Sequence, residues 1–98
     1  MSVVLVVPSQ LRALAGGRGR IELDVDAADG RPPTVRATLE VLRRNHPGLY
    51  DRIVTERHEL RPHVNVFVGH DDIRWSGGFG TRIPEGHEVV VLPSVSGG

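Results

Sequence analysis

Two short, uninterrupted apolar runs lie near opposite ends of the chain and limit its fold more than any other feature. The first, VVLVV, covers residues 3–7, and the second, VVVL, covers residues 89–92. Short runs rich in β-branched residues are typical of strands that are buried on both faces. We therefore predict that these two strands lie at the centre of a sheet, parallel to each other and fully buried.

Three further segments have strand patterns. Residues 20–26 alternate between polar and apolar side chains, which indicates a half-exposed strand, and residues 64–68 form another apolar run. Residues 69–72 are typical of a turn, and we predict a short strand after it at residues 73–75. The last strand is expected at residues 88–92, so that it includes the second apolar run.

Residues 34–46 have the spacing of an amphipathic helix. Thr34 is a suitable N-cap, and Pro47 with the glycine after it ends the helix. Residues 49–54 are expected to add one helical turn, and residues 9–15 a short helical segment. The apolar side chains of the main helix recur on one face, as helical periodicity requires: Val35, Leu39 and Leu42.

This order of elements favours an α+β fold of one domain, the ubiquitin-like β-grasp arrangement. In it, one main helix crosses a mixed sheet of four to five strands, with right-handed crossovers. Residues 1–92 are then the globular body, and residues 93–98 are an extended, flexible C-terminal tail with no element left to join.

Composition excludes several classes of site and partner. The chain contains no Cys, which excludes disulfides and cysteine-bound zinc, and all 12 basic residues are Arg, which excludes lysine catalysis. The 12 basic residues balance 12 acidic ones, so no net charge favours nucleic acid or an anionic membrane. The apolar runs are too short to span a bilayer, and we expect a cytoplasmic protein. The five histidines and the serines have no spacing typical of a metal site or a catalytic triad.

The last third of the chain resembles a known family. Residues 64–68 (VNVFV), 72–78 (DIRWSGG) and 83–98 (IPEGHEVVVLPSVSGG) are similar to the MoaD/ThiS family of ubiquitin-like sulfur carrier proteins. Within that family the chain most resembles the CysO-type carriers of actinobacterial cysteine biosynthesis. The order of elements agrees over the whole chain, whereas the motifs are confined to about residues 61–98.

The resemblance implies a carrier and not an enzyme. Gly98 would be adenylated by an E1-like activating enzyme of the MoeB/ThiF type and converted to a thiocarboxylate. A cysteine synthase or another acceptor enzyme would take the sulfur, and a JAMM-type metalloprotease would release the product. ATP and pyridoxal phosphate would bind only to those partners, so no cofactor is expected on this chain. The tail that enters the partners would be Pro93, Ser94, Val95, Ser96, Gly97 and Gly98.

The docking surface and the pathway stay open at this point. Trp75 and Phe79 flank an internal Ser-Gly-Gly loop, where they form either part of the core, as such aromatics usually do, or an exposed docking surface. The alternatives in function are the small subunit of molybdopterin synthase, a sulfur donor in another thiolation pathway, and a protein-conjugating or purely interacting β-grasp module. The sequence does not choose between the acceptors and does not give the oligomeric state.

Overall fold

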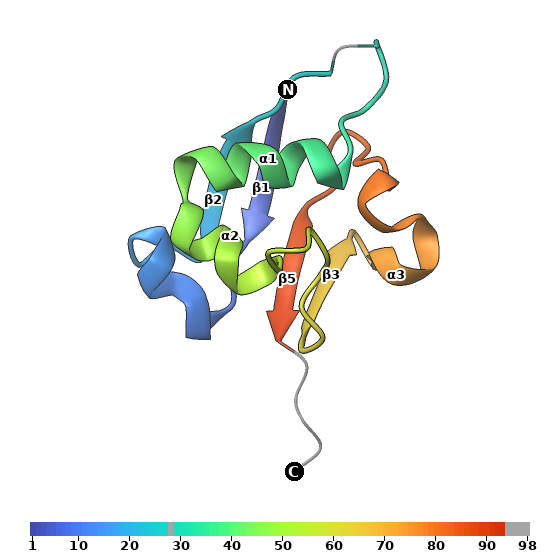
Figure 1. Ribbon diagram of the computed structural model, residues 1–98. Coiled ribbons are helices and arrows are strands. Elements are labelled where there is room, and N and C mark those ends of the chain that lie inside the picture. Colours follow the sequence, from blue (N-terminus) through green and yellow to red (C-terminus); the bar gives the residue numbers. More distant parts are fainter. Residues whose placement is uncertain (28, 94–98) are drawn as a thin grey trace.

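The computed structural model describes residues 1–27 and 29–93, which form one five-stranded mixed sheet with helices on it (Figure 1). The strand order is β2-β1-β5-β3-β4. The first and last strands are adjacent and parallel, and the other neighbouring pairs are antiparallel. This confirms the predicted β-grasp arrangement. The strands are β1 Ser2–Val6, β2 Arg20–Asp24, β3 Val64–Val68, β4 Asp71–Asp72 and β5 Val89–Pro93.

The main helix forms where the apolar periodicity predicts it. The Thr34 side chain accepts a hydrogen bond from the Ala37 amide at 3.1 Å, and this cap begins the helix. Pro47 ends that helix and is also the first residue of the next one, where its missing N–H costs nothing. The helical segments are η1 Ser9–Ala15, α1 Val35–Asn45, α2 Pro47–Ile53, α3 Ile73–Ser76 and η2 Gly78–Gly80.

Replacing Thr34 with Ala is expected to lower the free energy of unfolding by about 1 kcal/mol, because the amide at the start of α1 loses its acceptor. Thr34→Ser keeps the hydroxyl and should retain most of that stability. Urea unfolding followed by far-UV circular dichroism measures both variants. An equal loss of stability in Thr34→Ala and Thr34→Ser would contradict the capping role, because both variants lack the threonine methyl group and only one lacks the hydroxyl.

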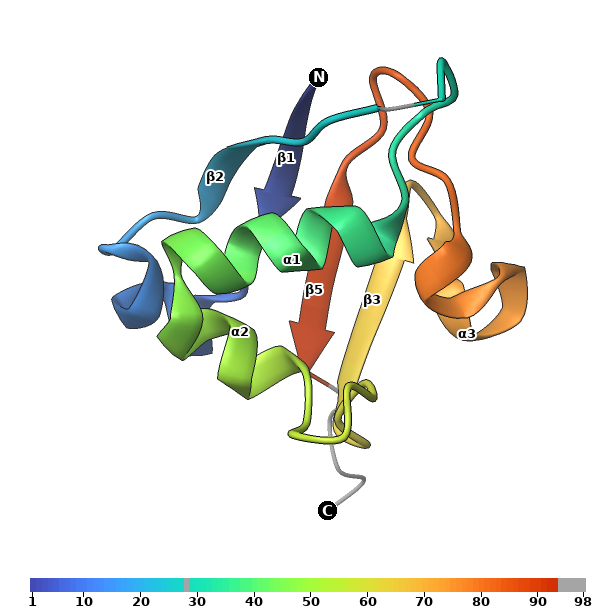
Figure 2. The ribbon, with the colours of Figure 1, turned by 45° about the horizontal axis from the view of Figure 1, so that its top comes forward.

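The core lies between the sheet and the helices α1 and α2, which cover one face of it (Figure 2). Alternate residues of each long strand point into this layer and are almost completely buried. The apolar faces of α1 and α2 supply the other side of this layer, with five buried residues: Val35, Leu39, Leu42, Leu49 and Ile53.

The prediction that the two central strands are fully buried is wrong. In β1, Val3 and Leu5 are buried, but Val4 and Val6 between them are only partly covered. The last strand alternates in the same way. The reason is that α1 and α2 both lie on one face of the sheet, as Figures 1 and 2 show. The second face of these central strands is therefore apolar without being covered by a helix.

Element bounds differ from the prediction by one or two residues at several places, and two differences concern the site. Residues 73–75 are not a strand: the short β4 precedes them, and α3 begins because the Asp72 carboxylate accepts from the Arg74 amide at 2.9 Å. The last strand extends to Pro93, which pairs with Val64, so the first predicted tail residue belongs to the sheet.

Across the part of the chain that the structure describes, no helix combines the length and the apolar character that crossing a bilayer requires.

Candidate functional site

The point at which the predicted tail leaves the body is fixed by pairing within the sheet. Leu92 and Pro93 pair with Asn65 and Val64 of β3, and β5 runs away from the N-terminal end of β1 (Figure 1). The remaining tail residues of the prediction lie outside the described residues, and among them is Gly98, which the resemblance predicts to carry sulfur: Ser94, Val95, Ser96, Gly97 and Gly98. The structure thus defines the surface around the start of the tail.

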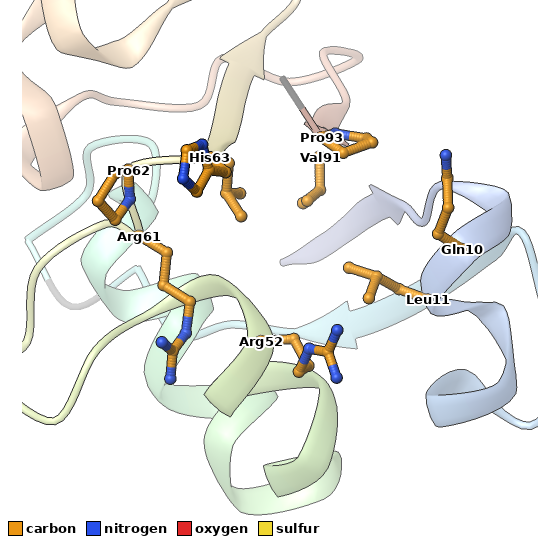
Figure 3. A pocket seen from close by; sticks show the side chains of 9 residues that line it. Gln10, Leu11, Arg52, Arg61, Pro62, His63, Val91 and Pro93 are labelled. Carbon is orange, nitrogen blue, oxygen red and sulfur yellow. The ribbon is translucent and has the colours of Figure 1, made fainter. Parts of the chain in front are cut away.

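A groove lies beside the end of β5, and we call it the tail groove. Its apolar lining comes from segments far apart in the sequence: Leu11, Pro62, Val64, Val91 and Pro93. Its polar lining is Gln10, Arg52, Arg61 and His63. Figure 3 shows Leu11 and Val91 directed toward each other from opposite sides, with Arg52 on the α2 side. Among the residues that the structure describes, no Asp or Glu lines this groove, so the charge of its described lining is positive.

The face of the sheet opposite the helices forms a second surface. Val6, Val90 and Phe67 are paired in register on three neighbouring strands, and therefore make one apolar row on this face. Arg20 continues the row on β2 and Asp72 continues it on β4. Together with Val4 and with Leu92, which is 45% exposed, this row is called the open sheet face.

An apolar centre with charged residues at its ends is the usual anatomy of a protein–protein interface. The open sheet face also ends beside Pro93, because Leu92 belongs to it. Contacts on this face and insertion of the tail can therefore be made by the same partner molecule.

The structure gives different environments to Trp75 and Phe79, the two aromatic residues for which the sequence left both the core and a docking surface open. Trp75 lies on α3 and is 86% exposed, which excludes the core alternative for this residue. Phe79 is partly buried and packs against the core. The segment under Trp75 is held to β3, since the Arg74 guanidinium donates to Asn65 Oδ1 at 2.6 Å and to the Val64 carbonyl at 2.7 Å.

The sequence pattern predicts neither the open sheet face nor the tail groove. The face was concealed because a continuous apolar run does not show which of its side chains a helix covers. One signal was available: a chain with one long helix can cover only one face of a five-stranded sheet. No such signal exists for the groove, whose lining comes from four separate segments.

The mixed sheet, with its first and last strands parallel and helices on one face, defines a class, the small ubiquitin-like β-grasp proteins. The model of the ThiS family matches residues 5–98, and the chain belongs to the ThiS family.

Named relatives are carriers and modifiers. The chain is 32% identical to the sulfur carrier protein CysO of Mycobacterium tuberculosis over 100 residues, which cover the whole of both chains. It is also 32% identical to small archaeal modifier protein 1 of Haloferax volcanii over 91 residues, 92% of this chain and 93% of the relative. Among solved structures, the BexX/CysO complex of Amycolatopsis orientalis contains a chain with a TM-score of 0.80 and 31% identity, over 98% of this chain and 99% of that one.

Proposed function

We propose that this protein is a sulfur carrier and that Gly98 holds the sulfur as a thiocarboxylate. The observation that carries the proposal is the Gly97-Gly98 pair, four and five residues beyond the end of a central strand, in a chain similar to a CysO carrier over its whole length. Five extended residues span at most roughly 17 Å, enough to bring a terminal carboxylate into a partner's active site. Two residues without side chains suit a narrow channel.

The chemistry needs an activating partner because a carboxylate is a poor electrophile. An E1-like enzyme of the MoeB/ThiF type would transfer AMP from ATP to the Gly98 carboxylate, releasing pyrophosphate. Sulfide then attacks the acyl carbon and AMP leaves, so that one oxygen is replaced by sulfur. The chain has no Cys, and its terminus is thus the position for the carried sulfur. In this account the chain is a co-substrate, and ATP binds to the partner.

The acceptor that we propose belongs to cysteine biosynthesis, which the similarity to CysO supports. A pyridoxal-phosphate-dependent cysteine synthase would hold an activated serine, and the Gly98 thiocarboxylate would supply its sulfur. A JAMM-type metalloprotease would then cut the new cysteine from the carrier. The rival acceptor within this chemistry is the large subunit of molybdopterin synthase, with which the carrier would form a lasting complex.

A test of the acceptor starts from protein that already carries the Gly98 thiocarboxylate. Incubation with such a cysteine synthase and its activated serine should give an intact mass one cysteine residue above that of the carboxylate form of the chain, because the carried sulfur becomes the sulfur of that cysteine. Hydrolysis by a JAMM-type protease should then return the mass to that of the carboxylate form. A stable complex with a molybdopterin synthase large subunit, without any cysteine adduct, would instead place the carrier in molybdopterin synthesis.

A second candidate is a protein modifier, which the similarity to small archaeal modifier protein 1 favours. It shares the adenylation step, but Gly98 would end in an isopeptide bond to a lysine of another protein. This chain has no Lys, so it cannot form chains of itself through its own side chains. Recovery of Gly98 linked to target lysines, with no thiocarboxylate formed, would favour the modifier.

The open sheet face is the docking surface that we propose for the activating enzyme. We expect Leu92→Glu to lower kcat/KM for adenylation by about 10- to 100-fold through KM, because a charge replaces an apolar contact at an interface. Leu14→Glu is the matched control, since Leu14 is 41% exposed on η1 and lies off the sheet. Adenylation kinetics that change equally in both variants would place the docking surface elsewhere.

A further inference from the structure

We propose that the tail groove receives an acidic segment of the activating enzyme, anchored by an apolar side chain, while the tail enters that enzyme's active site. This rests on the proposed function and names the partner's chemistry at one particular surface. The groove lies where the partner must already be in contact, because Pro93 forms part of its wall and the tail continues from Pro93.

The positive charge of the groove favours an occupant with negative charge. Arg52, Arg61 and His63 line it, and no carboxylate side chain does within residues 1–27 and 29–93, although acidic and basic residues are equal in number in the whole chain. The basic residues are thus segregated locally. A carboxylate-bearing segment is the complementary partner, and such complementarity increases both specificity and the rate of association.

The basic side chains differ in how much of their binding capacity is already used. Arg61 donates through Nε to the Asp51 carbonyl at 2.6 Å, which ties the rim of the groove to α2. Arg52 lies exposed in the last turn of α2, and its side chain makes neither a hydrogen bond nor an ion pair with any residue that the structure describes. Its guanidinium can therefore bind a carboxylate with two parallel hydrogen bonds without breaking a contact seen here.

The floor of the groove favours a protein segment over a phosphate-bearing ligand. Leu11, Val64 and Val91 give it an apolar base, and Figure 3 shows Leu11 and Val91 facing each other across it. Phosphate sites are typically built from backbone amides at helix N-termini or glycine-rich loops. Arg52 instead lies in the last turn of α2, at the C-terminal end of that helix. An apolar side chain flanked by carboxylates matches both parts of the lining.

The test is a charge reversal in the full chain, assayed with a MoeB/ThiF-type enzyme that adenylates the wild type. We expect Arg52→Glu to lower kcat/KM about tenfold through KM, with kcat unchanged and a weaker dependence on salt. Arg36→Glu makes the same charge change on α1, outside the groove, and should stay within about twofold of wild type. Exchanging an Asp or Glu of the enzyme for Arg should restore activity to the Arg52→Glu chain.

The outcomes separate this proposal from the proposed function. Adenylation of the wild type with equal kinetics for Arg52→Glu and Arg36→Glu overturns the groove and leaves the carrier function intact. Failure of the wild type to be adenylated overturns both. A protein lacking Gly97 and Gly98 gives an independent measurement: it should inhibit the wild-type reaction competitively, and Arg52→Glu should weaken that inhibition. The shortened chain could instead bind the enzyme more strongly than the full chain does, and Arg52→Glu could leave its inhibition unchanged. That result would mean that the tail itself occupies the groove, and it would also overturn the proposal.

Discussion

Deleting Gly97 and Gly98 is expected to abolish adenylation of the chain, because the deletion removes the carboxylate that becomes the acyl adenylate. The new terminus would be Ser96, which is two residues short of the reacting position and carries a side chain. Every core residue described lies between Val3 and Val91, so the thermal unfolding temperature should not change. ATP–pyrophosphate exchange with the activating enzyme measures the first effect, and calorimetry the second.

A matched variant separates the glycine carboxylate from the length of the tail. Deleting Ser94 and Val95 shortens the tail by the same two residues and keeps Gly97-Gly98 at its end. We expect this chain to lose reach and to react slowly, but still to form the adenylate. Full exchange activity after loss of Gly97 and Gly98 would contradict the assignment of the adenylated carboxylate to Gly98, whereas no exchange with the wild-type chain would favour an interaction module whose tail is inert.

Replacing Leu5 with Ala should have the largest effect on stability, a loss of about 3 to 5 kcal/mol in the free energy of unfolding. Leu5 is completely buried at the centre of β1, and it pairs with Ile21 on one side and Val89 on the other. The cavity would therefore lie in the middle of the core, where the rigid sheet prevents collapse around it. Urea unfolding measures the change.

The neighbouring residue provides the control. Val6 is on the same strand and points to the open sheet face, so Val6→Ala should cost less than about 1 kcal/mol. Far-UV circular dichroism is the suitable probe, because the one tryptophan, Trp75, is 86% exposed and reports little on the core. Equal losses for the two variants would contradict the one-sided burial of β1.

The sequence predicts the fold well because its local signals agree with one another. The alternation in β2, the apolar face of α1 and the Thr34 cap each indicate the element that forms. The prediction failed at residues 73–75, where a β-branched residue followed by an aromatic one favours a strand. A local side-chain bond from Asp72 to the Arg74 amide outweighs that preference and begins a helical turn.

The candidate site is predictable in one part only. The Gly97-Gly98 pair can be recognised in the sequence because the chemistry proposed for it depends on position along the chain. The tail groove depends on packing: η1, α2 and the loop before β3 have to meet beside β5 before Leu11, Arg52 and His63 line one surface. The exposure of Trp75 likewise follows from the way Arg74 and the buried Ile73 hold α3 at the edge of the sheet.

The intact mass of the full chain, after incubation with an activating enzyme, ATP and sulfide, tests the central claim most directly. If the chain is a sulfur carrier, its mass should increase by the difference between one sulfur and one oxygen, and fragmentation of the protein should locate the change at Gly98. An unchanged mass, with no adenylate and no pyrophosphate released, would contradict this claim.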